Sequence, residues 1–475
     1  MDGGICRQVG RVLMVVAACA ALATRANAQC ELVELSGDVP DDGFGFAVSV
    51  SAERALIRAK FSGGPGGAAR IYERSGASWS WVAELVADDH APGTGFANAL
   101  AIDGDRVVVG AKWDHMHEVM TGSAYVFEYA DGDWSQVAKL IADDGAEGDF
   151  FGSSVAISGD YAVVGAIYDG PGSAYVFERQ LDGEWVQAQK LTASDGQGGD
   201  EFGKSVAVSG DVIVVGAWGD DDMGWNAGSA YVFERGADDT WSQVAKLLPS
   251  DGRFLANIGR SVAVDGKLAL IGAPGADGQE SWSGAVYVFE RGGDATWLEV
   301  GKLIASDGQL ADNFGFSVAL DGDVALMGAR KDADNGTASG SAYVFVREWD
   351  GTWAQVAKLV PDDGEPWDWY GNSVAVSGNI GVVGMWPNDP NHDPIPGRAY
   401  IYAVGADEDE DGIMDACECP GDLNKDWIVD QSDLGILLAD WGCTGGDCPG
   451  DADGDGDTDQ SDLGLLLANW RDICP

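Results

Sequence analysis

Residues 151–178 have the sequence FGSSVAISGDYAVVGAIYDGPGSAYVFE, in which short apolar runs alternate with glycine-containing turns. Ser154–Ile157 predicts one strand and Tyr161–Val164 predicts a second, separated by a Ser-Gly-Asp turn. After a short loop, Gly172–Glu178 predicts a third strand. This stretch therefore predicts a run of short strands joined by tight turns.

The same pattern recurs seven times, and a Gly-Ala-like pair follows each start after fourteen residues. The repeats start at Phe44, Phe96, Phe151, Phe202, Ile258, Phe314 and Tyr370. A constant interval is expected where burial fixes the register of a strand-turn-strand segment. A fourth strand, as at Trp134–Leu140, and an acidic turn such as Asp143–Gly145 complete the unit. Four strands in about 50 residues is the period of a β-propeller blade.

The seventh repeat stops after its third strand, Ala399–Val404. The missing fourth strand is matched at the other end of the chain by Glu31–Leu35, which an acidic turn at Asp41–Gly43 follows. Pairing of the two ends would remove the exposed edge of an open ring. We therefore predict an all-β, seven-bladed propeller over residues 29–404, closed by the N-terminal strand.

The Phe-Gly and Gly-Ala pairs, with Pro274 completing Gly-Ala-Pro once, resemble the FG-GAP repeat. That repeat builds the propeller of integrin α-subunits and occurs in many bacterial secreted proteins. Many FG-GAP repeats hold an Asp-rich calcium loop between the two pairs. Here that stretch is a short turn, such as Ser209–Asp211, which is too short to surround a cation with six or more oxygens. We therefore expect no calcium in the blades.

The overall charge limits the class of partner. The 475 residues include 28 Lys and Arg against 78 Asp and Glu, a formal net charge of −50. Such a charge argues against binding to nucleic acid and to anionic membrane surfaces. No segment approaches the ~20 apolar residues of a membrane-spanning helix, so we expect no membrane span.

The N-terminus has the features of an export signal. Arg7 and Arg11 precede an apolar run, Val12–Ala23, and a small-x-small cleavage site at Ala26–Ala28. These features predict a signal peptide over residues 1–28 and a secreted or cell-surface protein. Lipoprotein processing at Cys19 is the alternative.

Residues 405–475 hold 20 acidic and 2 basic residues, at spacings typical of EF-hand-like calcium loops. The predicted ligands are Asp407, Asp409, Asp411, Asp415 and Glu418 in a first loop, Asp422, Asn424, Asp426, Ile428, Asp430 and Asp433 in a second, and Asp451, Asp453, Asp455, Asp457, Asp459 and Asp462 in a third. The first loop, within an acidic linker over residues 405–418, resembles a thrombospondin type 3 repeat. We expect two to three Ca²⁺ ions, with a solvated acidic linker as the alternative.

The second and third loops run into two nearly identical apolar helices, predicted over Gln431–Trp441 and Gln460–Trp470. This duplicated loop and helix resembles a type I dockerin over residues 419–475. The resemblance implies docking to a cohesin-like or cell-envelope protein, and its recognition positions would be Gln431, Ser432, Gln460 and Ser461. The leucines Leu434, Leu437, Leu463 and Leu466 are predicted to form the small core between the helices.

Six cysteines remain after residue 28, and an even number in an exported chain favours disulfides. The duplication predicts the pairs Cys419–Cys443 and Cys448–Cys474, with the exchanged pairing as the alternative. Cys30 and Cys417 are then predicted to join the two ends of the ring.

Catalytic signals are few. Asp114–Glu118 includes two histidines that could hold a transition metal, but it lies in a variable loop of one repeat, where such side chains more often face solvent. The tryptophan that begins the fourth strands predicts packing between strands and not a sugar-stacking platform. The favoured hypothesis is a secreted, non-enzymatic binding or scaffold protein whose propeller loops bind a protein or a glycan. The alternative is a dockerin-borne extracellular enzyme, glycoside hydrolase-like, acting on polysaccharide; carboxylates converging at the central channel would favour it.

Overall fold

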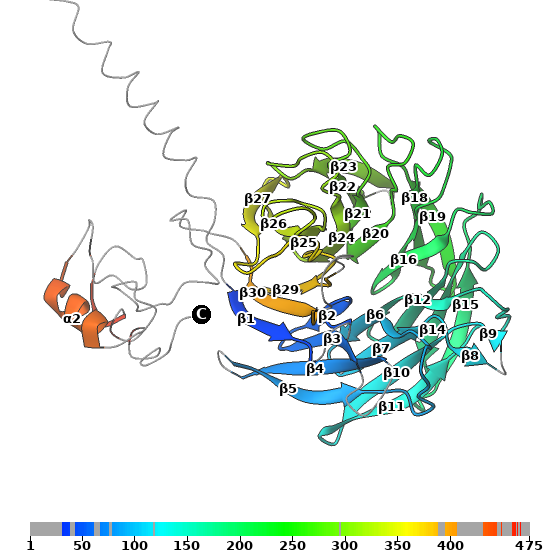
Figure 1. Ribbon diagram of the computed structural model, residues 1–475, viewed down its shortest axis with the longest axis horizontal. Helices are drawn as coiled ribbons and strands as arrows, with labels where there is room; N and C mark the ends of the chain where they lie inside the picture. The colour runs from blue at the N-terminus through cyan, green and yellow to red at the C-terminus, as the bar shows by residue number, and fades with distance from the viewer. Residues whose placement is uncertain are drawn as a thin grey trace, which may run out of the picture. The chain divides into compact units, whose positions relative to one another are not determined.

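The computed structural model describes residues 31–38, 43–60, 67–75, 78–116, 119–293, 296–387, 395–405, 431–443, 448, 458–461, 463 and 466. The chain divides into compact units with a boundary after residue 404, and the units are described separately. Seven four-stranded antiparallel sheets form the blades of a ring (Figure 1). The predicted seven-bladed, all-β propeller is therefore confirmed.

The blades are numbered from 1 to 7 along the chain. Blade 1 consists of β2 (Val48–Ser51), β3 (Arg54–Lys60), β4 (Gly67–Ser75) and β5 (Ser78–Leu85), blade 2 of β6 (Phe96–Asp103), β7 (Arg106–Ala111), β10 (Ser123–Ala130) and β11 (Asp133–Leu140), and blade 3 of β12 (Phe151–Ser158), β13 (Tyr161–Ala166), β14 (Ser173–Arg179) and β15 (Trp185–Leu191). Blade 4 consists of β16 (Phe202–Ser209), β17 (Val212–Ala217), β18 (Ser229–Arg235) and β19 (Trp241–Leu247), and blade 5 of β20 (Ser261–Asp265), β21 (Leu268–Ala273), β22 (Ala285–Arg291) and β23 (Trp297–Leu303). Blade 6 consists of β24 (Phe314–Asp321), β25 (Val324–Ala329), β26 (Ser341–Arg347) and β27 (Trp353–Leu359), and blade 7 of β28 (Ser373–Ser377), β29 (Ile380–Met385), β30 (Arg398–Ala403) and β1 (Glu31–Ser36). Blade 2 also carries a small hairpin, β8 (His115–Met116) and β9 (Val119–Met120).

The ring closes through the first strand of the chain. β1 pairs with β30 in antiparallel register, with Glu31 opposite Tyr402 and Leu35 opposite Ala399. The inner strands β28 and β2 are also in contact, which joins blade 7 to blade 1 (Figure 1). The predicted closure by Glu31–Leu35 is thus confirmed, and it gives β30 a neighbour on the side away from β29.

The Phe-Gly and Gly-Ala pairs meet where neighbouring blades touch. A Cβ atom on Gly110, in the Gly-Ala pair of blade 2, would lie 2.2 Å from the carbonyl oxygen of Gly152 in blade 3. Gly152 itself has a φ of 88°, and its Cβ would lie 2.2 Å from the carbonyl oxygen of Ser123. Side chains cannot be accommodated at either position. The repeat motif is therefore a direct consequence of close backbone contact between blades.

The short turns between the first two strands join neighbouring blades. In each blade a Ser or Asp side-chain oxygen accepts a hydrogen bond from a backbone N–H in the equivalent turn of the next blade. The acceptor–donor pairs are Ser51–Gly104 (3.0 Å), Asp103–Gly159 (2.6 Å), Ser158–Gly210 (3.2 Å), Ser209–Gly266 (3.1 Å), Asp265–Gly322 (2.9 Å), Asp321–Gly378 (2.6 Å) and Ser377–Ala52 (3.1 Å). These turns thus form a continuous ring of hydrogen bonds, which accounts for their repeated polar residue.

The repeated tryptophans of the fourth strands pack into the cores between blades. Trp185, Trp241 and Trp297 are buried, and Trp134 and Trp353 are half-buried against the same kind of cluster. The predicted packing role is confirmed. These rings are consequently not available as a platform for a ligand.

The C-terminal unit contains α2 (Gln431–Asp440). Leu437 and Leu466 are fully buried there, whereas Leu434 and Leu463 are half-buried, which agrees with the burial that the predicted core requires. Within the described part of the chain, no helix is both long and apolar enough to cross a membrane.

Candidate functional site

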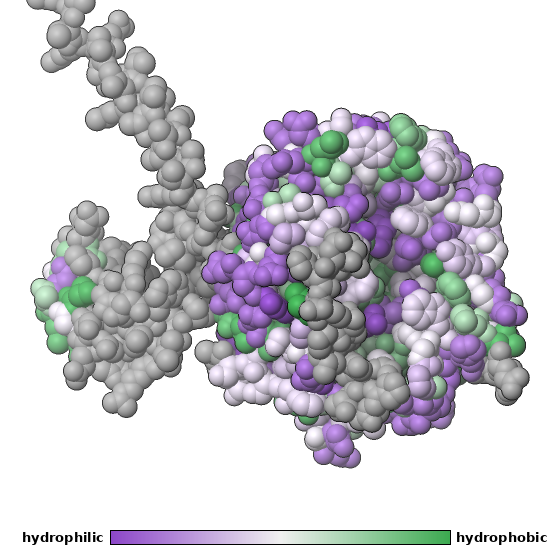
Figure 2. Space-filling model, viewed as in Figure 1, coloured by the Kyte–Doolittle hydropathy of each residue, from purple (hydrophilic) through white to green (hydrophobic). Residues whose placement is uncertain are grey.

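A cavity of about 380 Å³ lies at the centre of the ring and is lined by residues of all seven blades. Figure 2 shows one face of the propeller, with a hollow near its centre and hydrophilic side chains inside it. Cavities of this size hold small ligands in many proteins. The centre of the ring is therefore the candidate ligand site.

Two positions of the repeat supply the charged and the aromatic side chains that line this cavity. The residues directly after the Phe-Gly pairs are Phe46, Asn98, Ser153, Lys204, Arg260, Phe316 and Asn372. Of the residues directly after the Gly-Ala pairs, those that line the cavity are Lys112, Ile167, Arg330 and Trp386. The flanking glycines repeat along the chain, whereas these two positions change in charge, size and polarity from blade to blade.

Four cations line the central cavity: Lys112, Lys204, Arg260 and Arg330. We call these four residues the cationic cluster. Each one lies over at least one aromatic ring, a favourable cation–π arrangement. The distances from the charged group to the ring centroid are 4.9 Å for Lys112–Trp113, 4.4 Å for Lys204–Trp218, 4.1 Å for Arg260–Phe316, 3.5 Å for Arg330–Phe316 and 4.6 Å for Arg330–Trp369. Aromatic faces thus hold the cations in place without neutralising them.

Burial and mutual repulsion disfavour the charged forms of these groups. Burial, together with Arg260 and Lys112, lowers the pKa of Lys204 to about 8. Burial lowers the pKa of Arg260 to about 10, and burial with the neighbouring Arg260 charge lowers the pKa of Arg330 to about 10. The pKa of Lys112 is lowered by burial and by Arg58 and Arg260. The cationic cluster is therefore an electropositive centre whose members are close enough to repel one another.

Carboxylates are nearly absent from this centre. None of the described residues that line the cavity is Asp, Glu or His. Glu201 is nearby, with an oxygen 3.7 Å from the Lys204 nitrogen, and it also accepts a hydrogen bond from the Trp218 indole at 2.7 Å. Arg260 and Arg330 have no ion-pair partner among the residues that the structure describes. The arrangement suits attraction of an anion and offers no pair of acids for hydrolysis.

The acids of the blades belong to a different, repeated network. In blade 2, Lys139 lies 2.5 Å from Asp89 and 2.7 Å from Asp114, and the Tyr125 hydroxyl lies within hydrogen-bond distance of both carboxylates. The equivalent Lys246 of blade 4 contacts its own Asp residues in the same way. These carboxylates tie the connections between blades to the strands.

The histidine-containing segment of blade 2 is divided between two environments. Asp114 is buried and paired with Lys139, so the expectation that the side chains of this segment face solvent is wrong for this residue, because the repeated ion pair fixes it in the blade. His115 is exposed on β8. His117 and Glu118 lie outside the described residues.

Comparison with known protein families agrees with the repeat. A model described as FG-GAP repeat matches residues 79–127, 134–177, 185–233, 241–289, 297–345 and 353–402. The chain belongs to the FG-GAP repeat family. Each FG-GAP match begins in the fourth strand of one blade and ends in the third strand of the next, so the sequence unit is offset from the blade. The six matches leave out β1, the fourth strand of blade 7, and β2, β3 and β4, the first three strands of blade 1.

Two further comparisons add little to the FG-GAP assignment. A crystal structure of a protein from Lactobacillus plantarum aligns with a TM-score of 0.45 at 15% identity, covering 68% of this chain and 85% of that chain. No curated protein matches the chain.

Sequence reasoning predicted the FG-GAP framework but not the cationic cluster. The signal was present at two positions of the repeat, where several other repeats carry neutral residues: Lys204 and Arg260 directly follow the first pair, and Lys112 and Arg330 directly follow the Gly-Ala pair. A position that varies within an otherwise constant repeat is free of the packing that fixes its neighbours. In this FG-GAP propeller, residues at such positions line the central cavity.

The predicted calcium ligands are mostly outside the described residues. This applies to Asp407, Asp409, Asp411, Asp415, Glu418, Asp422, Asn424, Asp426, Ile428, Asp430, Asp451, Asp453, Asp455, Asp457 and Asp462. Asp433 is part of α2. Asp459 is exposed, and one of its carboxylate oxygens accepts a hydrogen bond from the Ser461 backbone N–H at 2.6 Å. Of the predicted recognition positions, Gln431 and Ser432 begin α2, whereas Gln460 and Ser461 are helical and exposed.

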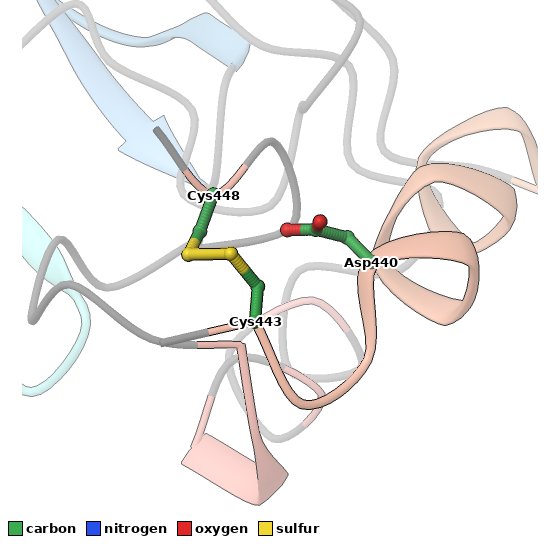
Figure 3. A group of neighbouring side chains, drawn as sticks. All are labelled: Asp440, Cys443 and Cys448. Atoms are coloured by element: carbon green, nitrogen blue, oxygen red, sulfur yellow. A yellow bond between two sulfur atoms is a disulfide. The ribbon is translucent and has the colours of Figure 1, made fainter. Parts of the chain in front are cut away.

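The cysteines of the C-terminal unit differ from the predicted pairing. Cys443 is bonded to Cys448, with 5.8 Å between their Cα atoms (Figure 3). The predicted Cys419–Cys443 and Cys448–Cys474 pairs are therefore wrong, because the chain turns back after α2 and brings two cysteines five positions apart together. Cys30, Cys417, Cys419 and Cys474 lie outside the described residues. Asp440 lies near the disulfide, but bonded sulfurs are not available as metal ligands.

Proposed function

We propose that this FG-GAP protein is an exported, non-enzymatic binding or scaffold protein. Its propeller takes a protein or glycan ligand at the central cavity, and its C-terminal module docks the protein to a cohesin-like or cell-envelope partner through calcium. The observation that carries the first part is the cationic cluster, held on aromatic rings at the one place where all seven blades converge.

The same site argues for binding over hydrolysis of polysaccharide. Glycoside hydrolysis usually needs two carboxyl groups within about 5–10 Å of each other beside the substrate. The described lining of the cavity provides cations, aromatic rings, amides and hydroxyls instead. The Asn98 and Asn372 side chains are fixed in the wall by hydrogen bonds to backbone carbonyls of 3.1 Å each. A fixed polar wall of this kind orients a ligand.

Three features support calcium-dependent docking. The three predicted ligand loops account for most of the acids after residue 404, and repulsion among so many carboxylates favours a bound cation. The leucine core around Leu437 and Leu466 gives the loops a small scaffold. Gln460 and Ser461 are exposed at the start of the second helical segment, as residues for recognition of a partner must be.

The test uses the full chain as bait against the secreted and envelope fraction of the source organism, first with calcium and then with chelator. We expect one discrete partner in calcium alone, lost on combined substitution of Gln460 and Ser461 by alanine. Incubation with a polysaccharide panel provides the second readout. Release of new reducing ends would contradict the non-enzymatic assignment and support the hydrolase alternative.

A further inference from the structure

We propose that the central cavity recognises a single acidic sugar unit, whose carboxylate meets the cationic cluster and whose ring stacks on the neighbouring aromatic side chains. This inference rests on the proposed function and names the ligand class of that site. The chemistry is that of a hexuronate, either free or at the end of a glycan.

The first argument is the geometry of the arginines. The guanidinium of Arg330 lies over Phe316 at 3.5 Å and over Trp369 at 4.6 Å. Stacking uses the faces of the guanidinium plane and leaves its edge, where the N–H groups point, for a carboxylate. A planar anion is the group that such an edge accepts.

The second argument is the contrast with the rest of the blades. The lysines of the fourth strands, such as Lys139 and Lys246, are each paired with two or more aspartates. Arg260 and Arg330 have no such partner among the described residues, although the chain carries 78 acids. Concentrating like charges in a half-buried site is unfavourable unless a ligand supplies the opposite charge. The cluster therefore has the electrostatics of an anion site whose counter-charge comes from outside.

The third argument is the remainder of the lining. Trp386 lies 5.8 Å from Trp369 and 5.0 Å from Phe46, measured between ring centroids, so a row of aromatic rings continues beside Arg330. Serine hydroxyls and the Asn98 and Asn372 amides complete the wall. An inorganic anion would use the cations alone. An acidic sugar would use the cations, the ring faces and the polar groups together.

Size and overall charge restrict the ligand further. A cavity of about 380 Å³ takes a small molecule or one terminal unit and not a folded polymer. The formal net charge of −50 repels a long polyanion, whereas one carboxylate entering the cavity meets the local positive potential. The ligand is therefore compact and carries few charges.

The test is calorimetric titration of the full chain with D-galacturonate, D-galactose and acetate. We expect binding of galacturonate, at least about tenfold weaker binding of galactose because it lacks the carboxylate, and weaker binding of acetate because it lacks the ring. Arg260→Met and Arg330→Met should each weaken galacturonate binding about tenfold or more.

The matched control is Arg253→Met. Arg253 also lies over a tryptophan, with 4.3 Å to the Trp282 centroid, but it is paired with Asp277 and does not line the cavity. It should bind galacturonate as the unsubstituted protein does. Equal affinity for galactose and galacturonate would overturn the charge recognition while leaving the propeller a sugar-binding protein. If the protein bound none of these probes but still captured another ligand through Arg330, the assignment of an acidic sugar would be refuted and the cavity would remain a binding site.

Discussion

Lys204 shows at the scale of one residue that the cavity is not optimised for stability. Its folded pKa of about 8 lies below the ordinary lysine value of 10.5, because burial, Arg260 and Lys112 outweigh the attraction of Glu201. The folded state therefore holds the lysine proton less tightly than the unfolded state does. By linkage this cost is fully present below pH 8 and is relieved as the pH rises from about 8 to 10.5.

The corresponding variant is Lys204→Met. It should raise the free energy of unfolding at pH 7 by about 1–3 kcal/mol, since it removes a charge that the fold disfavours while keeping the apolar stem. The measurement is denaturant unfolding at pH 7 and at pH 9.5, where the gain should shrink. Lys139→Met is the control of opposite sign. Although burial acts against it, hydrogen bonds to Asp114 and Asp89 raise the pKa of Lys139, so its loss should destabilise the protein. A Lys204→Met protein less stable than the original at pH 7 would contradict this account.

Two glycines test the contact between blades. Gly110→Ala places a Cβ 2.2 Å from the Gly152 carbonyl oxygen and should destabilise the protein by roughly 1–3 kcal/mol, because two backbones must separate. Gly198→Ala is the matched control, since neither glycine needs a positive φ and nothing lies within 4 Å of a Cβ at Gly198. It should be neutral or slightly stabilising. Thermal unfolding of the two variants side by side measures the difference, and equal unfolding temperatures would refute the close-contact explanation of the motif.

At the scale of elements, β1 is the strand whose removal has the largest predicted effect. Leu32, Val33 and Leu35 pack against the core shared by blades 7 and 1, and the Tyr402 hydroxyl lies 3.3 Å from a Glu31 oxygen. A chain that starts at Gly37 should lose about 3 kcal/mol or more of stability and expose the edge of β30. Size-exclusion chromatography should show association of this truncated chain through the free edge. A chain that starts at Gln29 is the control and should stay monomeric; a monomeric, equally stable Gly37 chain would show that the closure is dispensable.

The strands and the closure were predictable from sequence because all seven blades pack in the same way and therefore carry the same residue pattern. Most starts, such as Phe151, are a buried ring followed by a glycine in close backbone contact, and the exceptions Ala97 and Ile258 are buried as well. The cavity was not predictable in the same way. Lys204, Arg260 and Arg330 come from three successive blades, so the repeat marks their positions as variable but does not report that they line one cavity. The Cys443–Cys448 disulfide was not predicted either. The duplicated sequence suggested one equivalent pair in each copy, whereas the disulfide joins two cysteines only five positions apart in the chain.

At the scale of the whole molecule, charge is separated by position. The acids of the blades pair with lysines and arginines away from the axis, as Lys190 does with Asp144 and Asp169 at 2.6 Å each. The cations of the axis face the central cavity instead. An electronegative body with an electropositive centre selects against long polyanions and for a single acidic group. The same separation makes ligand affinity sensitive to ionic strength at the mouth of the cavity.

The chain divides into separate compact units, and this division predicts how calcium acts. The short turns of the blades are engaged in hydrogen bonds between blades, whereas all predicted calcium ligands lie after residue 404. Calcium should therefore stabilise the C-terminal unit by mass action and leave the propeller unchanged. Calorimetric unfolding of the full chain should show two transitions, of which only one moves to lower temperature on addition of chelator. Joint substitution of Asp451 and Asp453 by asparagine should abolish part of that shift, and the same change at Asp103 and Asp265 should leave it intact. A chelator-induced shift of the propeller transition would instead place a calcium site in the blades.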